Sequence, residues 1–310
     1  MKMHEDFIGD SREQVALDLL GETHLWTQIL LEDYLSVALG LRNCSLVTIP
    51  AEFPDGEAVA KSIDRVCVSD YRRVVSERDI ARKRKLIQQF KDKLRKTYEE
   101  TIVTFSSYNS HVAWANRLGL QVLEVEVRPT VRELYLHKEL GIRRAIEKLS
   151  KERDSFRERL IRSSGGSLPQ IAFAYAAEYS PEYVLRIGEL LGYPKCCIGA
   201  YVEGRRQGNV LAEERASNQI RTMRKQGAEP DPHAYFSKDF FPCTPVCENA
   251  GAVGRRLREG FAQFDHRLSE SYVECLKTNV AIVESHLEKM AIHKARMTVQ
   301  AQELGIRSLK

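Results

Sequence analysis

Four of the seven cysteines in this 310-residue chain stand in two tight groups, and each group follows a proline. Residues 194–197 read Pro-Lys-Cys-Cys, and residues 242–247 read Pro-Cys-Thr-Pro-Val-Cys. Proline is favoured at the first position of a helix, because its missing N–H needs no partner there. Each cysteine group is therefore predicted to lie at the start of a helix.

Helix starts of this kind favour thiolates. We expect Cys196 and Cys197 in the first turn of one helix, Cys247 in the first turn of a second, and Cys243 just before it. Backbone N–H groups and the positive end of the helix dipole stabilise negative charge there. Lys195 adds a cation beside the first pair, and such surroundings lower a cysteine pKa, as metal ligation and nucleophilic attack both require. If the two helix starts meet, the four cysteines form one four-thiolate centre.

The spacing bears on which metal this centre would hold. Zinc sites usually draw ligands from C-x2-4-C spacings, which the second group fits and the adjacent pair Cys196 and Cys197 does not. Neighbouring side chains on a helix point about 100° apart, so placing both around one small ion strains the backbone. An iron–sulfur cluster offers widely separated corners and accepts adjacent ligands more readily. The sequence therefore favours an iron–sulfur centre over zinc, and ligation by only three of the cysteines would leave one iron open to a substrate.

Two other interpretations compete with metal binding. In the first, Cys243 and Cys247 form a redox-active disulfide, and Cys196 or Cys197 attacks a substrate. In the second, all four are small buried hydrophobic residues, since free cysteine is among the most buried residue types. Two proline-associated groups, each opening a predicted helix, favour a shared chemical role over coincidence.

The same residues resemble a known family. Gly192-Tyr-Pro-Lys-Cys-Cys, followed by Phe241-Pro-Cys-Thr-Pro-Val-Cys, is similar to an uncharacterised archaeal and bacterial domain-of-unknown-function family. Its members carry a Gly-Tyr-Pro-x-Cys-Cys element and a downstream Pro-Cys-x-x-x-Cys element. The resemblance covers roughly residues 170–265. It implies that the four cysteines form one site, and it supplies no reaction.

Hydrophobic periodicity predicts an α-rich α/β fold with a small sheet in the N-terminal half. Helices are expected over residues 14–39, 72–98, 110–118, 130–158, 181–191 and from 248 onward, and strands over residues 45–50, 65–68, 101–105 and 121–127. The order of strand, helix and strand from 101 to 127 indicates a β-α-β unit. Residues 162–169, Arg-Ser-Ser-Gly-Gly-Ser-Leu-Pro, are the predicted linker. We therefore expect an N-terminal α/β domain, 1–162, and a helical cysteine-containing domain, 168–310, with a long C-terminal helix.

His233 and Lys195 are the catalytic candidates. His233 lies on the loop before the second cysteine group, where it could act as a general acid or base or as an alternative ligand. A histidine at such a loop position is more often exposed to solvent and has no catalytic role. Lys195 stands directly before Cys196, and it could equally be a solvated surface lysine.

Basic residues concentrate in one predicted helix. Between Arg72 and Lys96 there are eleven Lys and Arg against three acids, whereas the whole chain carries 47 against 43. Such a helix could follow a nucleic-acid phosphate backbone, although a solvated face is the more common meaning of the pattern. No aromatic RNA-binding signature accompanies it. The sequence also lacks the glycine-rich motifs of nucleotide-binding loops and the nucleophile motif of serine hydrolases.

The leading hypothesis is a cytoplasmic metal-thiolate enzyme that acts on a small molecule through an iron–sulfur centre or zinc. Its N-terminal domain would shape the substrate pocket or the surface that binds a partner. The apolar stretches are too short to span a membrane, and no apolar segment follows the charged N-terminus. The alternatives are an RNA-binding or tRNA-modifying protein with a structural metal, and a dithiol redox protein. The amphipathic C-terminal helix is compatible with a homodimer.

Overall fold

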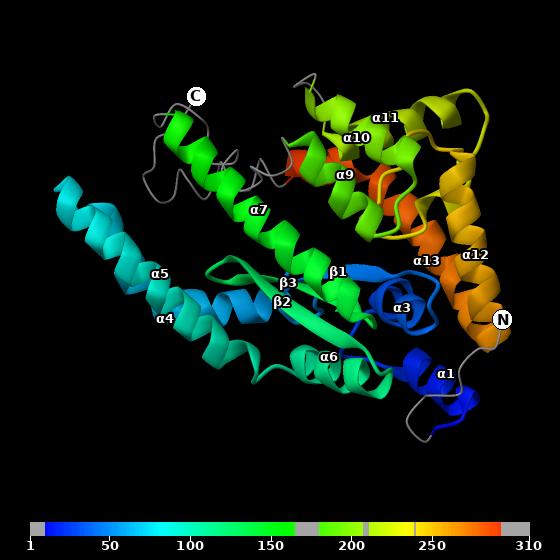
Figure 1. The fold of residues 1–310 in the computed structure, drawn as a ribbon, viewed down its shortest axis with the longest axis horizontal. Coiled ribbons are helices and arrows are strands. Elements are labelled where there is room, and N and C mark those ends of the chain that lie inside the picture. Colours follow the sequence, from blue (N-terminus) through cyan, green and yellow to red (C-terminus); the bar gives the residue numbers. More distant parts are fainter. Residues whose placement is uncertain (1–9, 165–179, 207–210, 239, 293–310) are drawn as a thin grey trace. The chain divides into compact units, whose positions relative to one another are not determined.

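The structure, a computed structural model, describes residues 10–164, 180–206, 211–238 and 240–292 (Figure 1). The chain divides into two compact units. Unit 1 comprises Met1–Lys151, Leu190–Gly192 and Ala262–Leu268; unit 2 comprises Glu152–Glu189, Tyr193–Phe261 and Ser269–Lys310. Within the described residues the fold is helical apart from one small sheet in the N-terminal half, which confirms the predicted α-rich α/β class.

Unit 1 contains the sheet and the helices next to it in sequence. Its elements are α1 (Arg12–Gly21), α2 (Thr27–Ile29), the π-helical η1 (Leu30–Leu35), α3 (Ser36–Ala38), β1 (Cys44–Ile49), α4 (Gly56–Ser76), α5 (Ile80–Ile102), α6 (Ser106–Arg117), β2 (Gln121–Arg128), β3 (Val131–His137) and the first half of α7 (Leu140–Ser164).

The sheet has the order β1-β3-β2, and both pairings are antiparallel. His137 at the end of β3 pairs with Cys44 of β1 on one side and with Gln121 of β2 on the other. The middle of β3, residues 134–136, is buried. A central strand with partners on both edges explains why this segment is strand despite its charged residues.

Helices α4 and α5 pack against each other as a helical hairpin. At its base, Val59 and Ile63 of α4 meet Tyr98 and Ile102 of α5 in a buried cluster. The turn of the hairpin is formed by residues 77–79. This apolar base is what attaches the two long helices to one another.

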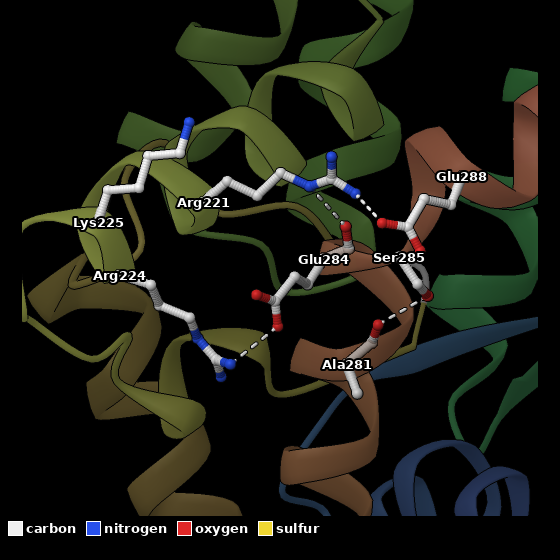
Figure 2. A pocket seen from close by; sticks show the side chains of 7 residues that line it. All are labelled: Arg221, Arg224, Lys225, Ala281, Glu284, Ser285 and Glu288. Atoms are coloured by element: carbon white, nitrogen blue, oxygen red, sulfur yellow. Dashed lines mark hydrogen bonds and ion pairs between the residues drawn. The ribbon is translucent and has the colours of Figure 1, made fainter.

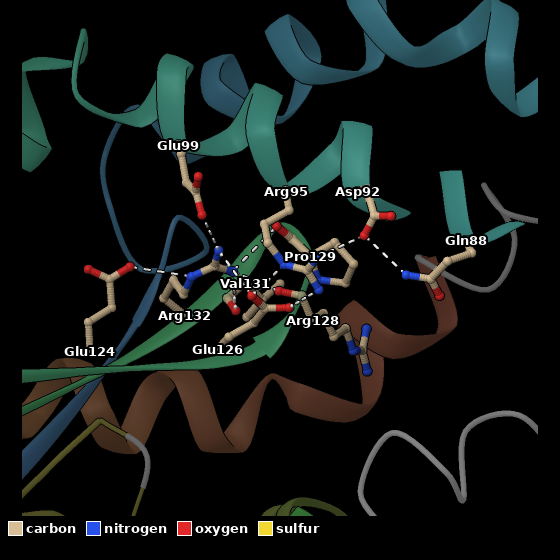
Figure 3. A network of polar contacts seen from close by, with 10 residues as sticks. All are labelled: Gln88, Asp92, Arg95, Glu99, Glu124, Glu126, Arg128, Pro129, Val131 and Arg132. Carbon is tan, nitrogen blue, oxygen red and sulfur yellow. Dashed lines mark hydrogen bonds and ion pairs between the residues drawn. The ribbon is translucent and has the colours of Figure 1, made fainter. Parts of the chain in front are cut away.

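An ionic network joins α5 to the β2–β3 hairpin (Figure 3). The guanidinium group of Arg95 donates to both carboxylate oxygens of Glu126, at 2.8 Å each, which lowers the pKa of Glu126. The buried Arg132 lies 3.4 Å from the carboxylates of Glu124 and Glu126. Its guanidinium carbon also lies 4.7 Å from the centre of the Tyr98 ring. The cations near the base of the helical hairpin are therefore paired with acids of the sheet.

Two predicted strands and the β-α-β unit are wrong. Residues 65–68 lie inside α4, and residues 101–105 contain the end of α5 and the turn after it. In both segments the side chains that face inward, Cys67 and Ile102, fill the apolar base of the helical hairpin. Packing between two helices has therefore overridden the strand preference of β-branched residues.

Three predicted helices are shorter or interrupted. Residues 131–137, predicted as helix, are strand β3. The long basic helix is broken at residues 77–79, where the Asp79 side chain accepts a hydrogen bond from the Arg82 N–H at 2.8 Å and caps α5. The helix expected over 14–39 stops at Gly21 and resumes at Thr27.

Unit 2 is helical in its described part. Its elements are the second half of α7, α9 (Pro181–Leu190), α10 (Lys195–Arg206), α11 (Ala212–Lys225), the 3-10 helix η3 (Pro232–Tyr235), most of α12 (Glu248–Phe264) and most of α13 (His266–Glu284). Helix α7 ends at Ser164; the rest of the predicted linker and the chain after residue 292 lie outside the described residues.

The segment around η3 forms the core of unit 2. The rings of Phe236 and Phe240 lie 4.3 Å apart, centre to centre. The Tyr272 hydroxyl donates to the Phe236 carbonyl at 2.9 Å, and the Asn279 amide donates to the Tyr235 carbonyl at 2.8 Å. Helix α13 therefore holds this loop through buried hydrogen bonds as well as apolar contacts. None of the described helices is long and apolar enough to cross a membrane.

A buried histidine makes the stability of unit 1 sensitive to acid. His111 of α6 is hydrogen-bonded to the Tyr34 hydroxyl, and the rings of Tyr34, Phe53 and Tyr108 surround it. Burial lowers the pKa of His111 from 6.5 to about 4.

We expect the free energy of unfolding to decrease as the pH falls from 6.5 to about 4, because the unfolded chain then binds a proton that the folded chain excludes at His111. The contribution is complete above pH 6.5, and over the whole window it amounts to about 3 kcal/mol. The variant His111→Gln should show a flatter profile, measured by urea denaturation at several pH values. An unchanged slope in the variant would contradict this assignment.

Candidate metal centre

A tight corner between α9 and α10 presents the first cysteine pair. Gly192 has a φ of 77°, a left-handed conformation that glycine adopts without strain, and it ends α9 as predicted. Pro194 directly precedes α10, and its carbonyl accepts a hydrogen bond from the Cys197 N–H at 2.9 Å. Cys196 and Cys197 therefore lie in the first turn of α10, also as predicted.

Cys247 lies one residue before α12, rather than in its first turn as predicted. Its carbonyl accepts the first helical hydrogen bond, from the Gly251 N–H at 2.8 Å, so Cys247 is the N-cap residue. A turn closed by the Cys247 N–H and the Thr244 carbonyl, at 3.1 Å, brings Cys247 back towards Cys243. Pro245 occupies the second position of this turn, which proline favours, instead of the first position of the helix.

Two glycines let α12 lie against the loop that leads to the second group. A Cβ atom at Gly254 would lie 2.2 Å from the carbonyl oxygen of His233, and one at Gly251 would lie 2.6 Å from a carboxylate oxygen of Asp231. A larger residue at Gly254 would require the loop backbone to move, whereas one at Gly251 would displace the side chains of Asp231 and Arg255. The close contact fixes the start of α12, and with it Cys247, relative to this loop.

The four sulfur atoms converge. The Sγ atom of Cys196 lies 3.8 Å from that of Cys197 and 3.7 Å from that of Cys247. The third side of this triangle, Cys197 to Cys247, measures 3.6 Å. All four Sγ atoms, including that of Cys243, lie within 4.8 Å of one another. The two cysteine groups, far apart in sequence, therefore meet in space.

The four thiols differ in exposure and in acidity. Cys196 is exposed, Cys243 is half-buried, and Cys197 and Cys247 are buried. Burial raises the pKa of the Cys196 thiol, but hydrogen bonds from Asn249 and from the neighbouring thiols outweigh it, and the pKa falls below its ordinary value. Burial is also the main cause that raises the pKa values of Cys197 and Cys243. The lowering of the pKa expected at helix starts is therefore seen at Cys196, and the opposite shift is seen at Cys197 and Cys243.

Four convergent sulfur donors suit a metal ion. All four cysteines are free thiols, and the measured separations far exceed the S–S bond length of about 2.05 Å. Two N–H groups also point at the sulfurs. The Cys243 N–H donates to the Sγ of Cys197, and the Asn249 amide donates to the Sγ of Cys196, both at 3.4 Å. Such hydrogen bonds stabilise thiolate charge around a bound ion.

Lys195 and His233 lie in unit 2 but outside this sulfur group. Lys195 is the first residue of α10; its ammonium group is exposed and lies 3.8 Å from the Glu189 carboxylate. His233 is in η3, with its Nδ1 atom 3.2 Å from the Asp231 carboxylate, which also accepts a hydrogen bond from Arg255 at 3.0 Å. The catalytic roles of Lys195 and His233 remain predictions.

Asn249 is a site residue that sequence reasoning missed. It follows Cys247 by two residues, in the first turn of α12, and its amide reaches the Sγ of Cys196 from the other cysteine group. A polar residue just after a predicted ligand was the only available signal, and it is weak. Only the folded arrangement shows that Asn249 connects the two groups.

A groove between α11 and α13 is a second concave feature of unit 2 (Figure 2). It has a volume of about 620 Å³ and is lined on one side by Arg221, Arg224 and Lys225 of α11. Arg221 and Arg224 face Glu288, which follows α13, and Glu284 at the end of α13. Arg221 pairs with Glu288 at 2.9 Å and Arg224 pairs with Glu284 at 3.2 Å. Because Glu284 and Glu288 neutralise two of its three cations, the groove does not have the character of an anion-binding pocket.

We expect Cys196 to react with iodoacetamide faster than Cys197 in metal-free native protein. Cys196 is exposed with a lowered pKa, whereas Cys197 is buried with a raised pKa. Tandem mass spectrometry of the shared peptide would locate the modification. The variant Asn249→Ala, which removes a hydrogen bond to the Cys196 sulfur, should slow the reaction. Equal native rates at the two cysteines would contradict the assignment, and denatured protein is the control in which the difference disappears.

Comparison with known proteins agrees with the resemblance seen in the sequence. A family model described as "Protein of unknown function (DUF483)" matches residues 120–271. The match contains all four cysteines and begins at residue 120 rather than near residue 170, so it also includes β2, β3 and α7. No curated protein and no solved structure matches the chain. The chain is therefore similar to the uncharacterised domain family DUF483 over residues 120–271.

Proposed function

We propose that this is a zinc-binding protein in which Cys196, Cys197, Cys243 and Cys247 hold a single ion. The ion would connect the first turn of α10 to the segment before α12 and so stabilise unit 2. The observation that supports this proposal is the separation between the sulfur atoms.

A tetrahedral zinc ion places its sulfur ligands at a fixed spacing. With Zn–S bonds of about 2.3 Å, the edge of the sulfur tetrahedron is about 3.8 Å. The triangle of Cys196, Cys197 and Cys247 has sides of 3.6–3.8 Å. Three of the ligands are therefore already at the separation that one ion requires, and Cys243 is close enough to be the fourth.

The same distances disfavour an iron–sulfur cluster. A [4Fe–4S] cluster places each cysteine on a different iron, and a [2Fe–2S] cluster places two cysteines on each of two irons, so in neither do all four sulfurs have the spacing of ligands on one ion. Here all four lie within 4.8 Å of one another. The adjacent pair was the reason to favour a cluster from sequence, since neighbouring helical side chains diverge by about 100°. At 3.8 Å, the sulfurs of Cys196 and Cys197 have the spacing of two ligands on one ion.

Four protein ligands indicate a structural role for the ion. A catalytic zinc keeps one position for water or substrate, whereas a structural zinc has all four positions filled by the protein. The burial of Cys197 and Cys247 and the N–H groups aimed at two sulfurs favour such a closed site. The proposal therefore departs from the small-molecule chemistry that the sequence suggested.

We expect purified protein to contain one zinc ion per chain and no acid-labile sulfide. The variants Cys197→Ser and Cys247→Ser should lose the ion, because each removes one of the four donors. Cys275→Ser is the matched control, since Cys275 is also a buried cysteine but lies outside the sulfur group. Metal content would be measured by elemental analysis and sulfide by its colorimetric assay.

A second measurement separates ligation from damage to the fold. Co²⁺ added to the metal-free wild-type protein should give the visible absorption of a tetrahedral thiolate site, which reports coordination directly. Iron with matching sulfide would overturn the proposal in favour of a cluster. Absence of any metal, with no cobalt spectrum, would reject metal binding altogether.

A further inference from the structure

The outer half of the α4–α5 hairpin extends into solvent. None of the residues 68–96, from just after the apolar base on α4 around to α5, is buried. With a rise of 1.5 Å per residue, α4 extends about 14 Å beyond Cys67. We call residues 72–85, which contain the turn, the tip of the hairpin. The tip makes no contribution to the core, so its composition is free to serve another purpose.

The tip is strongly basic and its cations are not neutralised. It contains seven Lys and Arg side chains, and among the described residues none of them forms an ion pair; they are Arg72, Arg73, Arg78, Arg82, Lys83, Arg84 and Lys85. Closer to the base the situation reverses. Lys93 pairs with Asp70, and Arg95 pairs with Asp92 and Glu126. Within the part of the chain that the structure describes, basic side chains near the base of the hairpin therefore have acidic partners, whereas those at the tip, beyond the core, do not.

The two acidic residues of the tip, Glu77 and Asp79, accept hydrogen bonds from backbone N–H groups. The Glu77 carboxylate accepts the Asp79 N–H at 2.9 Å, and the Asp79 carboxylate accepts the Arg82 N–H at 2.8 Å. They shape the turn and begin α5. They are not arranged as partners for the surrounding cations.

The cations at the start of α5 act against the stability of the helix. The first turn has no acidic residue, and Arg82, Lys83 and Arg84 place positive charge at the positive end of the helix dipole. The Asp79 cap offsets only part of this positive charge, and a local arrangement that lowers stability without full compensation points to a functional site. We infer that a negatively charged binding partner supplies the charge that would neutralise these cations.

The distribution of the cations fits a linear polyanion. Residues 82–85 are consecutive, so their side chains point in directions about 100° apart around α5. The cations extend over about 10 Å of the hairpin, and a DNA duplex of that length carries about six phosphate charges. Exposed apolar side chains at the tip, Val75 and Ile80, are few beside seven cations, which favours a phosphate backbone over a lipid surface.

We propose that the tip of the α4–α5 hairpin binds the phosphate backbone of a nucleic-acid duplex without reading its base sequence. Base edges are read by side chains placed in a groove with hydrogen-bonding geometry, whereas point charges spread around a helix contact phosphates. The hairpin belongs to unit 1 and the cysteines to unit 2, so this proposal does not rest on the metal centre.

The test compares two triple variants of the full-length protein. Arg82→Gln, Arg84→Gln and Lys85→Gln together remove three cations of the tip. Arg144→Gln, Lys148→Gln and Lys151→Gln together are the matched control: these exposed cations of α7 form no ion pair within the described residues, and the change in net charge is the same. Binding is measured by fluorescence anisotropy with labelled RNA and DNA duplexes of one sequence, over a range of salt concentrations.

We expect the wild type and the α7 control to bind duplex with an affinity that falls steeply with salt. The tip variant should have a dissociation constant at least about tenfold higher at low salt, and on DNA its logarithmic salt dependence should be shallower by about 2 to 3. A preference between the RNA and the DNA duplex would identify the polymer.

Three results would overturn the proposal. They are the absence of duplex binding even at low salt, an equal loss of binding in the two triple variants, and binding to phosphatidylserine-containing vesicles but not to duplexes. Circular dichroism of both variants would establish that each remains folded.

Discussion

The crowding of four cysteine sulfurs is the constraint that organises unit 2. Sulfur atoms held within 4.8 Å of one another cannot all carry a negative charge without a cation between them. Without an ion, at least some must keep their protons, which agrees with the raised pKa values of Cys197 and Cys243. The fold brings them together through the corner before α10 and the turn before α12. A metal ion at the centre would balance the charge of four thiolates.

Among the described residues of unit 1, the basic side chains close to the sheet are paired with acidic side chains, and those far from the sheet are not. Near the sheet, Arg95 and Arg132 are held by Glu124 and Glu126, and the buried Arg132 also contacts an aromatic ring. Towards the tip of the α4–α5 hairpin, the acids serve the backbone and the cations are exposed. One continuous pair of helices thus has a structural half and a half that is available to a partner.

The sequence predicted the parts of the fold that depend on local signals. Gly192 and Pro194 mark the corner before Cys196 because their backbone preferences act over a few residues. Strand β3 was missed because it is stabilised by pairing with β1 and β2, and β1 lies far away in sequence. For the same reason residues 101–105 were misassigned, since their role in the hairpin depends on α4.

The sequence was sufficient to predict which four cysteines form the site, but not the distances between their sulfur atoms. The grouping of the four residues was visible, whereas their sulfur separations depend on side-chain torsions and on how two helix starts meet. Those separations carry the argument about which metal is bound. Asn249 was invisible for a related reason, because its partner Cys196 belongs to a different segment of the chain.

Because a long segment separates the two cysteine groups, a metal ion bound by both would restrict the conformations of the unfolded chain. Cys197 and Cys243 are 46 residues apart, and α11 and η3 lie between them. A cross-link that closes a loop of this length removes conformational entropy from the unfolded state equivalent to about 4 kcal/mol in the chain-entropy description. An ion bound by the four sulfurs would thus act as a reversible cross-link. A disulfide is broken by reduction, whereas this cross-link would be broken by removal of the metal.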